Sequence, residues 1–221
     1  MHVHDACGQK IYKVKDMKYY VKCSLFAFAY LIAMDIGAFL FAYIQIVALR
    51  AALSIFWALF YCFIVGVMFF KEGETALDFR HANDLERRHM VESGVPVELD
   101  VAPEYKPYKG FVIGLYACIP MLFGLLIHSV LGIATGGTAN GAGIVTSAVY
   151  FTFYMIYGSL VTKNAEGVVE SMGFGEYYLI LIGLVIMCVA IGVSYILGAK
   201  KAQMKYDLIE RKQREIYGGK E

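Results

Sequence analysis

The chain has 221 residues, of which 59% are hydrophobic and only 18% carry a charged side chain. An ordinary soluble domain has about 45–50% apolar and about 25% charged residues, so this composition argues against a water-soluble protein. The formal net charge is +1, but the positive residues are segregated. Five, six and seven of the 20 Lys and Arg residues fall in residues 1–22, 71–109 and 200–221.

Long apolar runs separate these three basic blocks. A transmembrane helix needs about 20 apolar residues, so the chain has room for about four or five spans and no separate soluble domain. Positive charge is retained on the cytoplasmic side during membrane insertion. We therefore predict an all-α, polytopic helical protein of the cell membrane, with both termini and residues 71–109 in the cytoplasm. No secretory signal with a cleavage site is visible, so we expect the N-terminus to be retained.

The first part of the chain predicts a basic tail and a hairpin of two spans. Residues 1–22 form the tail, which we expect at the inner membrane surface. The first predicted span is 24–49 and the second is 51–70. Only Arg50 separates them, so the turn must be tight, and we expect it around residues 45–51 with Arg50 at the outer interface. One basic residue there is a weak exception to the positive-inside tendency.

Residues 71–109 are predicted to be the main cytoplasmic loop. Thr75 followed by Asp78 has the spacing of a capping box, and Ser93 before a glycine indicates a helix stop, so we predict a helix at 75–92. This helix is polar on nearly all faces, so it either needs a partner or is solvated. The remainder contains three prolines and is predicted to be irregular or extended.

The third predicted span, 110–132, carries a pattern of small residues. Gly110, Gly114 and Cys118 recur every four residues, a seam that lets another helix approach closely. Pro120 removes one backbone hydrogen bond and predicts a kink. We therefore assign these four residues a role in helix packing.

The last third of the chain leaves the span count open. Residues 144–161 are apolar but rich in Tyr, Thr and Ser, and 177–199 is the last predicted span. If 144–161 crossed the membrane, the basic tail at 200–221 would lie outside. Charge bias therefore favours four spans with 144–161 as a re-entrant or interfacial segment, and five spans remain the alternative. The tail is predicted to extend the last helix and to contact anionic lipid or a partner.

Asp35 lies near the middle of the first predicted span. A carboxylate at that depth costs at least a few kcal/mol, so it must be protonated, paired or facing water. No Lys or Arg lies within a predicted span to pair with it. We expect a neutral acid hydrogen-bonded to a Tyr, a Ser or a backbone carbonyl. Two interpretations are open: a proton- or cation-responsive group, or an interhelical hydrogen bond that fixes packing.

His128 is the second intramembrane candidate and lies in the outer half of the third predicted span. It could hydrogen-bond Gln45 or Tyr43 near the outer end of the first hairpin. Pairing with Asp35 would need a tilted or kinked helix, because the two residues lie at different depths. A histidine at this position is typical of a packing or hydrogen-bonding residue, and a functional role is the alternative.

We predict no metal, cofactor or catalytic site. The N-terminal HVHDAC offers ligands from one short peptide, whereas structural metal sites combine two separated pairs. Glu74, Asp78 and His81 share a helix face without a second ligand set.

Phosphate-loop, dinucleotide, nucleophile-elbow and HExxH motifs are absent from the sequence. The basic blocks flank spans, which indicates lipid contact and no nucleic-acid binding. The five cysteines, none in a CxxC pair, are expected to pack as small hydrophobic residues.

Three stretches carry a family resemblance. HANDLERRHMVESGV is a charged, Asp/Asn-containing segment, and YKGFVIGLYACIP follows it as a Lys-Gly entry to a span broken by Ile-Pro. GVSYILGAKKA is a Tyr-x-x-Gly exit into a basic tail. In these stretches, within residues 80–121 and 192–202, the chain resembles a group of small multi-pass membrane proteins of Firmicutes whose function is not established. The resemblance implies a four-span type of membrane protein and no particular activity.

Two functions from different classes fit the sequence. The first is a non-enzymatic accessory, assembly or regulatory subunit that acts through a membrane-protein partner or as a homo-oligomer. Small-residue seams, a polar helix without its own core and few polar groups in the spans favour it. The alternative is a small oligomeric transporter in which Asp35 couples proton or cation movement to transport. A membrane-embedded enzyme is less favoured, because no paired catalytic groups are evident at one depth.

Overall fold

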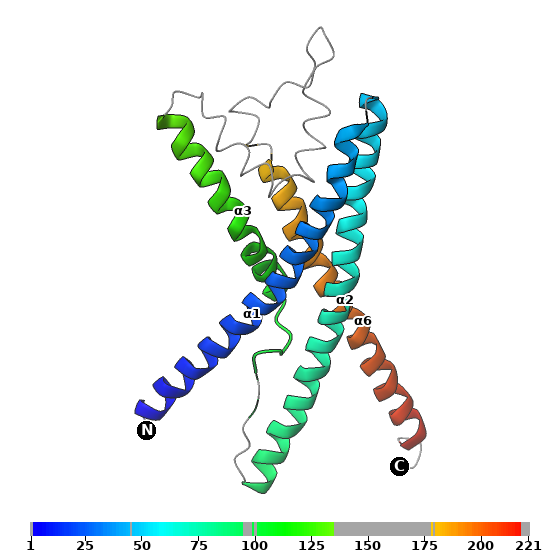
Figure 1. Cartoon of the computed structure of the whole chain (residues 1–221). Helices are drawn as coiled ribbons and strands as arrows, with labels where there is room; N and C mark the ends of the chain where they lie inside the picture. The colour runs from blue at the N-terminus through cyan, green and yellow to red at the C-terminus, as the bar shows by residue number, and fades with distance from the viewer. Residues whose placement is uncertain are drawn as a thin grey trace. The chain divides into compact units, whose positions relative to one another are not determined.

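The structure is a computed structural model of the chain, and it describes residues 2–44, 46–94, 99, 101–134, 178 and 180–217. These residues form four long α-helices and one short 3-10 helix, without any strand in the described ranges (Figure 1). The predicted all-α class is therefore confirmed. The elements are α1 (His2–Phe39), η1 (Leu40–Tyr43), α2 (Val47–Ser93), α3 (Lys109–Ala134) and α6 (Ile180–Tyr217).

All four of these α-helices are long and apolar enough to cross a membrane. At a rise of about 1.5 Å per residue, the 47 residues of α2 extend about 70 Å, more than twice the hydrocarbon core of about 30 Å. The 38 residues of α1 and of α6 extend about 57 Å, whereas the 26 residues of α3 extend about 39 Å. Three helices are therefore much longer than a membrane crossing requires, and their additional residues include basic ones.

The turn between the first two spans lies earlier than the position of Arg50 suggested. η1 ends at Tyr43 and α2 begins at Val47, so the predicted span 24–49 is wrong at its C-terminal end. The backbone N–H of Arg50 donates to the carbonyl of Ile46 at 2.9 Å, which is a helical bond in the first turn of α2. Arginine is a good helix former, so a single charge in an apolar run does not end a helix.

The predicted helix at 75–92 is the C-terminal half of α2 and not a separate helix. The capping interpretation of Thr75 is wrong, because its Oγ1 donates to the carbonyl of Lys71 one turn earlier, at 3.0 Å. Because α2 runs through Thr75 without a break, the backbone N–H groups there are already hydrogen-bonded within the helix and need no capping side chain. The predicted stop agrees with the structure: α2 ends at Ser93, and Gly94 adopts a φ of 69°, which is typical of the glycine after a helix.

The remaining predicted spans coincide with α3 and α6. α3 covers the predicted span 110–132 and continues through Pro120, which lies on its exposed side. α6 covers most of the predicted span 177–199 and runs on without a break into the predicted helical tail. The segment 144–161 lies outside the described residues.

The chain divides into two compact units, and each contains part of every α-helix. All three basic blocks belong to unit 1, and most of each apolar run belongs to unit 2. Unit 1 comprises Met1–Cys23, Gly66–Ile113 and Ile191–Glu221, and unit 2 comprises Ser24–Val65 and Gly114–Ala190.

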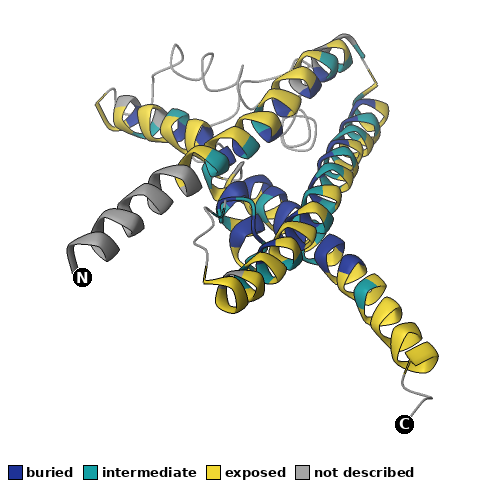
Figure 2. Ribbon diagram, turned by 90° about the horizontal axis from the view of Figure 1, so that it is seen from below, coloured by how far each residue is buried: buried dark blue, intermediate teal, exposed yellow. Residues whose placement is uncertain are grey.

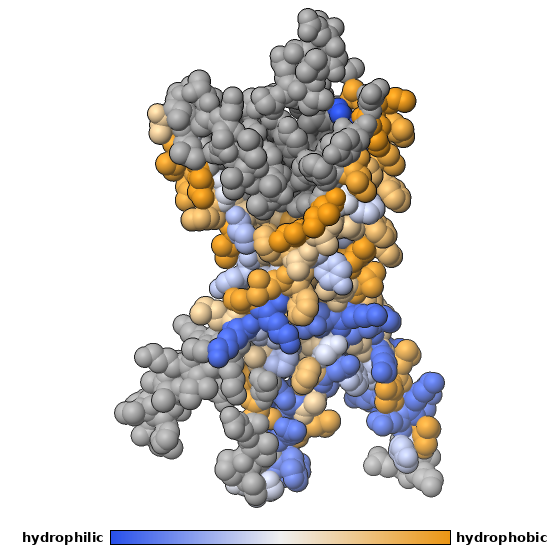
Figure 3. Space-filling model, viewed as in Figure 1, coloured by the Kyte–Doolittle hydropathy of each residue, from blue (hydrophilic) through white to orange (hydrophobic). Residues whose placement is uncertain are grey.

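The surface of unit 2 is strongly apolar. Large hydrophobic side chains are exposed on its described helices, as Figure 3 shows, among them Phe56, Phe63, Leu126 and Ile133. Soluble proteins rarely expose contiguous apolar patches larger than a few hundred Å². This surface is suited to lipid and agrees with a membrane-embedded protein.

Within unit 2, α1 and α2 form an antiparallel pair. The buried side of α1 repeats every three or four residues, at Ala27, Leu31, Met34 and Ala38 (Figure 2). Trp57 of α2 donates from Nε1 to the carbonyl of Met34 at 2.9 Å, and its ring lies over Gly37. Tyr61, one turn later, donates to the carbonyl of Ala27 at 3.2 Å. Increasing numbers on α2 meet decreasing numbers on α1, as in a hairpin.

In unit 1, α2 and α6 touch backbone to backbone, and their contacts advance in the same direction on both helices, from Glu74 with Lys201 to Asp78 with Tyr206. A Cβ atom on Gly73 would lie 2.0 Å from the carbonyl oxygen of Tyr195, and one on Gly198 would lie 1.8 Å from that of Phe70. Only glycine permits such an approach. A small buried cluster follows, formed by Leu77, Ala199 and Ala202 with Tyr105 packed against it. The polar half of α2, expected to lack a core of its own, therefore has an apolar partner in α6.

Candidate functional site: the polar network of unit 1

The two intramembrane candidates lie in different helices of unit 2. Asp35 belongs to α1 and His128 to α3. The side chains of both residues lie outside the described part of the structure. Their proposed roles in protonation, cation binding or hydrogen bonding therefore stay predictions.

The small-residue seam of α3 faces α6. In unit 1, a Cβ on Gly110 would lie 2.7 Å from the Cβ of Tyr195. In unit 2, a Cβ on Gly114 would lie 3.0 Å from the Cα of Cys188, and the Sγ atoms of Cys118 and Cys188 are 3.5 Å apart. All three seam residues thus lie where small side chains allow two helices to approach.

Unit 1 also contains a set of polar side chains that the sequence analysis did not identify as a site. These side chains connect α1, α2, α3 and the segment between α2 and α3. We call them the polar network. Its members are Tyr19, Glu72, Asn83, Asp84, Arg87, Glu104 and Lys109.

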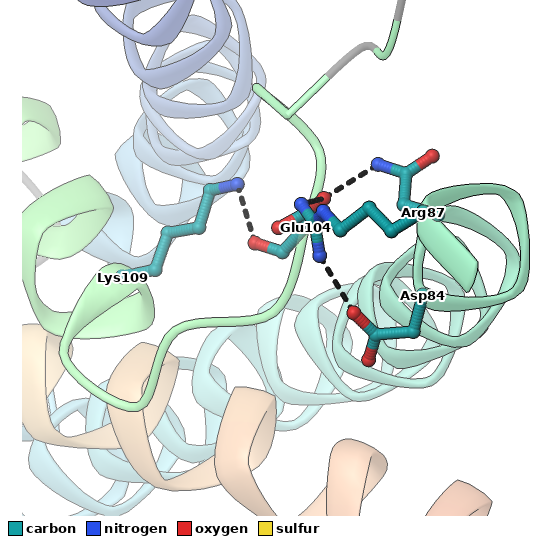
Figure 4. A network of polar contacts seen from close by, with 5 residues as sticks. Asp84, Arg87, Glu104 and Lys109 are labelled. Atoms are coloured by element: carbon teal, nitrogen blue, oxygen red, sulfur yellow. Dashed lines mark hydrogen bonds and ion pairs between the residues drawn. The ribbon is translucent and has the colours of Figure 1, made fainter. Parts of the chain in front are cut away.

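Glu104 is the acceptor at the centre of the polar network and is only 7% exposed. Its carboxylate accepts hydrogen bonds from Nδ2 of Asn83 at 2.6 Å and from Nη2 of Arg87 at 2.5 Å. Arg87 also donates from Nη1 to Asp84 at 2.6 Å, so its guanidinium lies between two carboxylates (Figure 4). A buried carboxylate is costly unless charged or polar donors surround it, and here both kinds do. Glu104 therefore fastens the α2–α3 connection to α2.

Lys109, the first residue of α3, is the most deeply buried charge of the polar network, at 1% exposure. Its Nζ donates to the carbonyl oxygens of Ala102 and Glu104, the latter at 3.0 Å (Figure 4). The same ammonium lies 4.1 Å from the centroid of the Tyr19 ring. Carbonyl acceptors and an aromatic face together replace the water that a buried ammonium loses.

Tyr19 joins Lys109 to α2. The face of its ring contacts the ammonium of Lys109, while its Oη donates to the carboxylate of Glu72. A second ring, that of Tyr20, lies 5.7 Å from the same ammonium. One aromatic residue of α1 therefore contacts α2 and α3 at once, through two different kinds of interaction.

α6 is attached to α2 by a further row of contacts in unit 1. Nζ of Lys201 lies 2.6 Å from Oε1 of Glu74, and Tyr206 donates to Asp78 at 2.7 Å while its ring lies 4.0 Å from that of His81. The hydrogen bond to Asp78 raises the pKa of Tyr206. The acidic face considered above as a metal site thus contacts α6. Among the described residues, no group of three or more His, Cys, Asp and Glu is placed to hold a metal ion.

The geometry of the polar network is suited to fastening helices. Its buried charged residues, Glu104 and Lys109, contact polar side chains, backbone carbonyls or an aromatic ring. The contacts of Tyr19 with Glu72 and Lys109, and those of Glu104 with Asn83 and Arg87, join different elements of the chain. The polar network therefore fixes the path of the α2–α3 connection and the entry of α3.

The sequence contained one signal for this site. Asn83, Asp84 and Arg87 lie in HANDLERR, and Lys109 lies in YKG, which are two of the stretches that carry the family resemblance. The third stretch, within 192–202, forms the close approach of α6 to α2. All three therefore meet in unit 1, although their spacing alone did not indicate a contact.

No protein-family model matches the chain, and comparison with curated proteins and with solved structures also gives no match. The resemblance to the Firmicutes membrane proteins stays a prediction.

Proposed function

We propose that this chain is a non-enzymatic, multi-pass protein of the cell membrane that acts as an accessory, assembly or regulatory subunit, and that unit 1 is its cytoplasmic contact surface. The observation that supports this proposal is the set of apolar side chains exposed on the helical continuations of unit 1. In α2, Leu85 is 66% exposed and Val91 is 86% exposed. In α6, Leu208 and Ile216 are also exposed. Apolar side chains in these positions suit a protein partner.

The directions of the helices support four spans. In unit 2, Gly114 of α3 lies against Cys188 of α6, and Oγ of Ser129 lies 2.8 Å from Oη of Tyr178, so the two helices are antiparallel. The chain therefore leaves α3 and enters α6 on the same side of unit 2. A connection that starts and ends on one side crosses a membrane an even number of times. This argument favours 144–161 as a re-entrant or interfacial segment.

The charge distribution then supports cytoplasmic termini. All three basic blocks belong to unit 1, and unit 1 also contains both ends of the chain. Because the cytoplasmic side retains Lys and Arg during insertion, unit 1 is the part that we assign to the cytoplasm. Its polar network holds α1, α2 and α3 in one arrangement, which gives a partner protein a fixed surface to bind.

Co-purification from native membranes in a mild detergent tests the proposal. We expect a stoichiometric partner with the wild-type chain and its loss with the double variant Leu85→Ser, Val91→Ser. The matched control is Glu86→Ser, Glu92→Ser, because these residues are exposed on the same half of α2. Size-exclusion chromatography checks that both variants stay folded. A wild-type chain that purifies alone as a monomer, or a partner retained equally by both double variants, would contradict the proposal.

A further inference from the structure

Two cysteines from different helices face each other in unit 2. The Sγ atoms of Cys118 in α3 and Cys188 in α6 are 3.5 Å apart, and the Cys118 thiol also points at the carbonyl of Leu184, 3.8 Å away. A disulfide has a sulfur–sulfur distance of about 2.05 Å, so the two sulfur atoms need to approach by only about 1.5 Å. From the sequence alone, both thiols are expected only to pack as small hydrophobic residues.

The backbone around the pair is closely packed. Gly114, one turn before Cys118, would place a Cβ atom 3.0 Å from the Cα of Cys188. Buried side chains surround the two cysteines on both helices, namely Ala117, Met121, Leu184 and Met187. The close packing of the two helices therefore places the two sulfur atoms at contact distance.

Both thiols lie deep in the apolar part of the chain. Cys118 follows Lys109 by nine residues and Cys188 precedes Lys200 by twelve residues. Along continuous helices these separations correspond to about 14 Å and about 18 Å from the charged ends, near the middle of a hydrocarbon core of about 30 Å. Water-soluble thiols and disulfides do not reach this depth. Cys118 is buried whereas Cys188 is partly exposed, so a reagent dissolved in the lipid has access to Cys188.

We propose that Cys118 and Cys188 form a redox-active pair whose oxidant is a lipid-soluble quinone. In the reaction, both S–H bonds break and one Sγ–Sγ bond forms. The two electrons and two protons released reduce the quinone to its hydroquinone, so the reaction is balanced without a further reactant. The disulfide links α3 to α6 within unit 2 and fixes their separation. This inference does not depend on the proposed accessory role.

Thiol counting in reduced membrane vesicles tests the pair directly. A short-chain quinone is added, the protein is denatured and alkylated, and intact mass spectrometry counts the alkylated cysteines. We expect the wild-type chain to lose two alkylation sites, and proteolysis to give a linked peptide that joins α3 to α6. Oxidised glutathione at the same concentration should give no linked peptide between α3 and α6. Cys62→Ser should keep the two-site loss, whereas Cys118→Ser and Cys188→Ser should abolish it.

The alternatives give different results in the same experiment. Unchanged alkylation of the wild-type chain, a linked peptide that contains Cys62, or equal oxidation by quinone and oxidised glutathione would each overturn the proposal. If a Cys118 variant does not fold, the linked peptide from the wild-type chain decides the question by itself.

Discussion

A buried lysine must recover the interactions that its ammonium makes with water, and Lys109 does so in part through uncharged groups. Two backbone carbonyls accept its hydrogen bonds, and the ring of Tyr19 lies 4.1 Å below its charge. The carboxylate of Glu104 is directed instead toward Arg87. The ring of Tyr19 contacts the charge of Lys109 directly, so it contributes to the stability of unit 1.

The two contacts of Tyr19, with Lys109 and with Glu72, give a prediction for two substitutions of this residue. Tyr19→Phe keeps the ring and removes only the hydrogen bond to Glu72, so we expect a loss of about 0.5–1.5 kcal/mol in the free energy of unfolding. Tyr19→Leu also removes the cation–π contact, and we expect it to lose a further ~1–2 kcal/mol. The measurement is unfolding of the purified protein in detergent, followed by tryptophan fluorescence of Trp57.

Lys109→Met provides the control for this pair, because it retains an unbranched apolar stem and removes the charge. In the Lys109→Met protein, the difference in the free energy of unfolding between Tyr19→Phe and Tyr19→Leu should fall to the part that comes from side-chain packing alone. If the difference is the same with and without the charge, the interaction between Lys109 and the Tyr19 ring does not stabilise the protein.

Among single residues, those in periodic patterns were predictable and those in the irregular connection were not. Gly110 and Gly114 repeat at the helical period, so their sequence alone indicated a closely packed face. Glu104 lies in a proline-containing segment without periodicity, and its contact with Arg87 depends on the path of that segment through space. Lys109 resembled a lysine that flanks a span at the membrane surface, because nothing local in the sequence shows that a tyrosine ring will cover it.

The elements of the fold followed from the lengths of the apolar runs, and their ends did not. A run of about 20 apolar residues is sufficient to indicate a span. In the sequence, Arg50 and Thr75 both indicate a helix boundary, but each lies inside α2. Inside a continuous helix the backbone N–H and C=O groups are already hydrogen-bonded to one another. A residue typical of a helix end therefore does not end the helix there.

The crossing of α2 and α6 is the contact between elements that tolerates substitution least. We expect Gly73→Ala and Gly198→Ala each to lower the free energy of unfolding by about 3 kcal/mol, because the new methyl group would overlap a backbone carbonyl and force the helices apart. Gly66→Ala is the matched control on α2. Its Cβ would meet only the hydroxyl of Ser194, at 3.1 Å, and alanine favours the helix by up to about 1 kcal/mol.

Thermal unfolding of the three variants in the same detergent measures this contrast. The first two variants should unfold at clearly lower temperatures than the wild-type protein, and Gly66→Ala should unfold near it. Equal behaviour of Gly66→Ala and Gly73→Ala would show that the backbone contact between α2 and α6 is not formed.

At the scale of the whole molecule, helix direction and charge lead to the same topology. α1 and α2 are antiparallel in unit 2, α3 and α6 are antiparallel there as well, and the basic blocks all belong to unit 1. The connection between α3 and α6 contains Glu166, and we propose that it crosses the membrane an even number of times. On the basis of the positive-inside tendency, we propose that Glu166 lies outside and that unit 1 lies in the cytoplasm.

Single-cysteine labelling in intact cells tests this topology, in a background without the five native cysteines. We expect Glu166→Cys to react with a membrane-impermeant maleimide from outside. Leu85→Cys, placed at an exposed position of α2 in unit 1, should react only after the membrane is permeabilised. A wild-type elution volume confirms that each variant is folded. If Glu166→Cys and Leu85→Cys both require permeabilisation, the segment between α3 and α6 does not lie outside. The four-span topology would then be wrong.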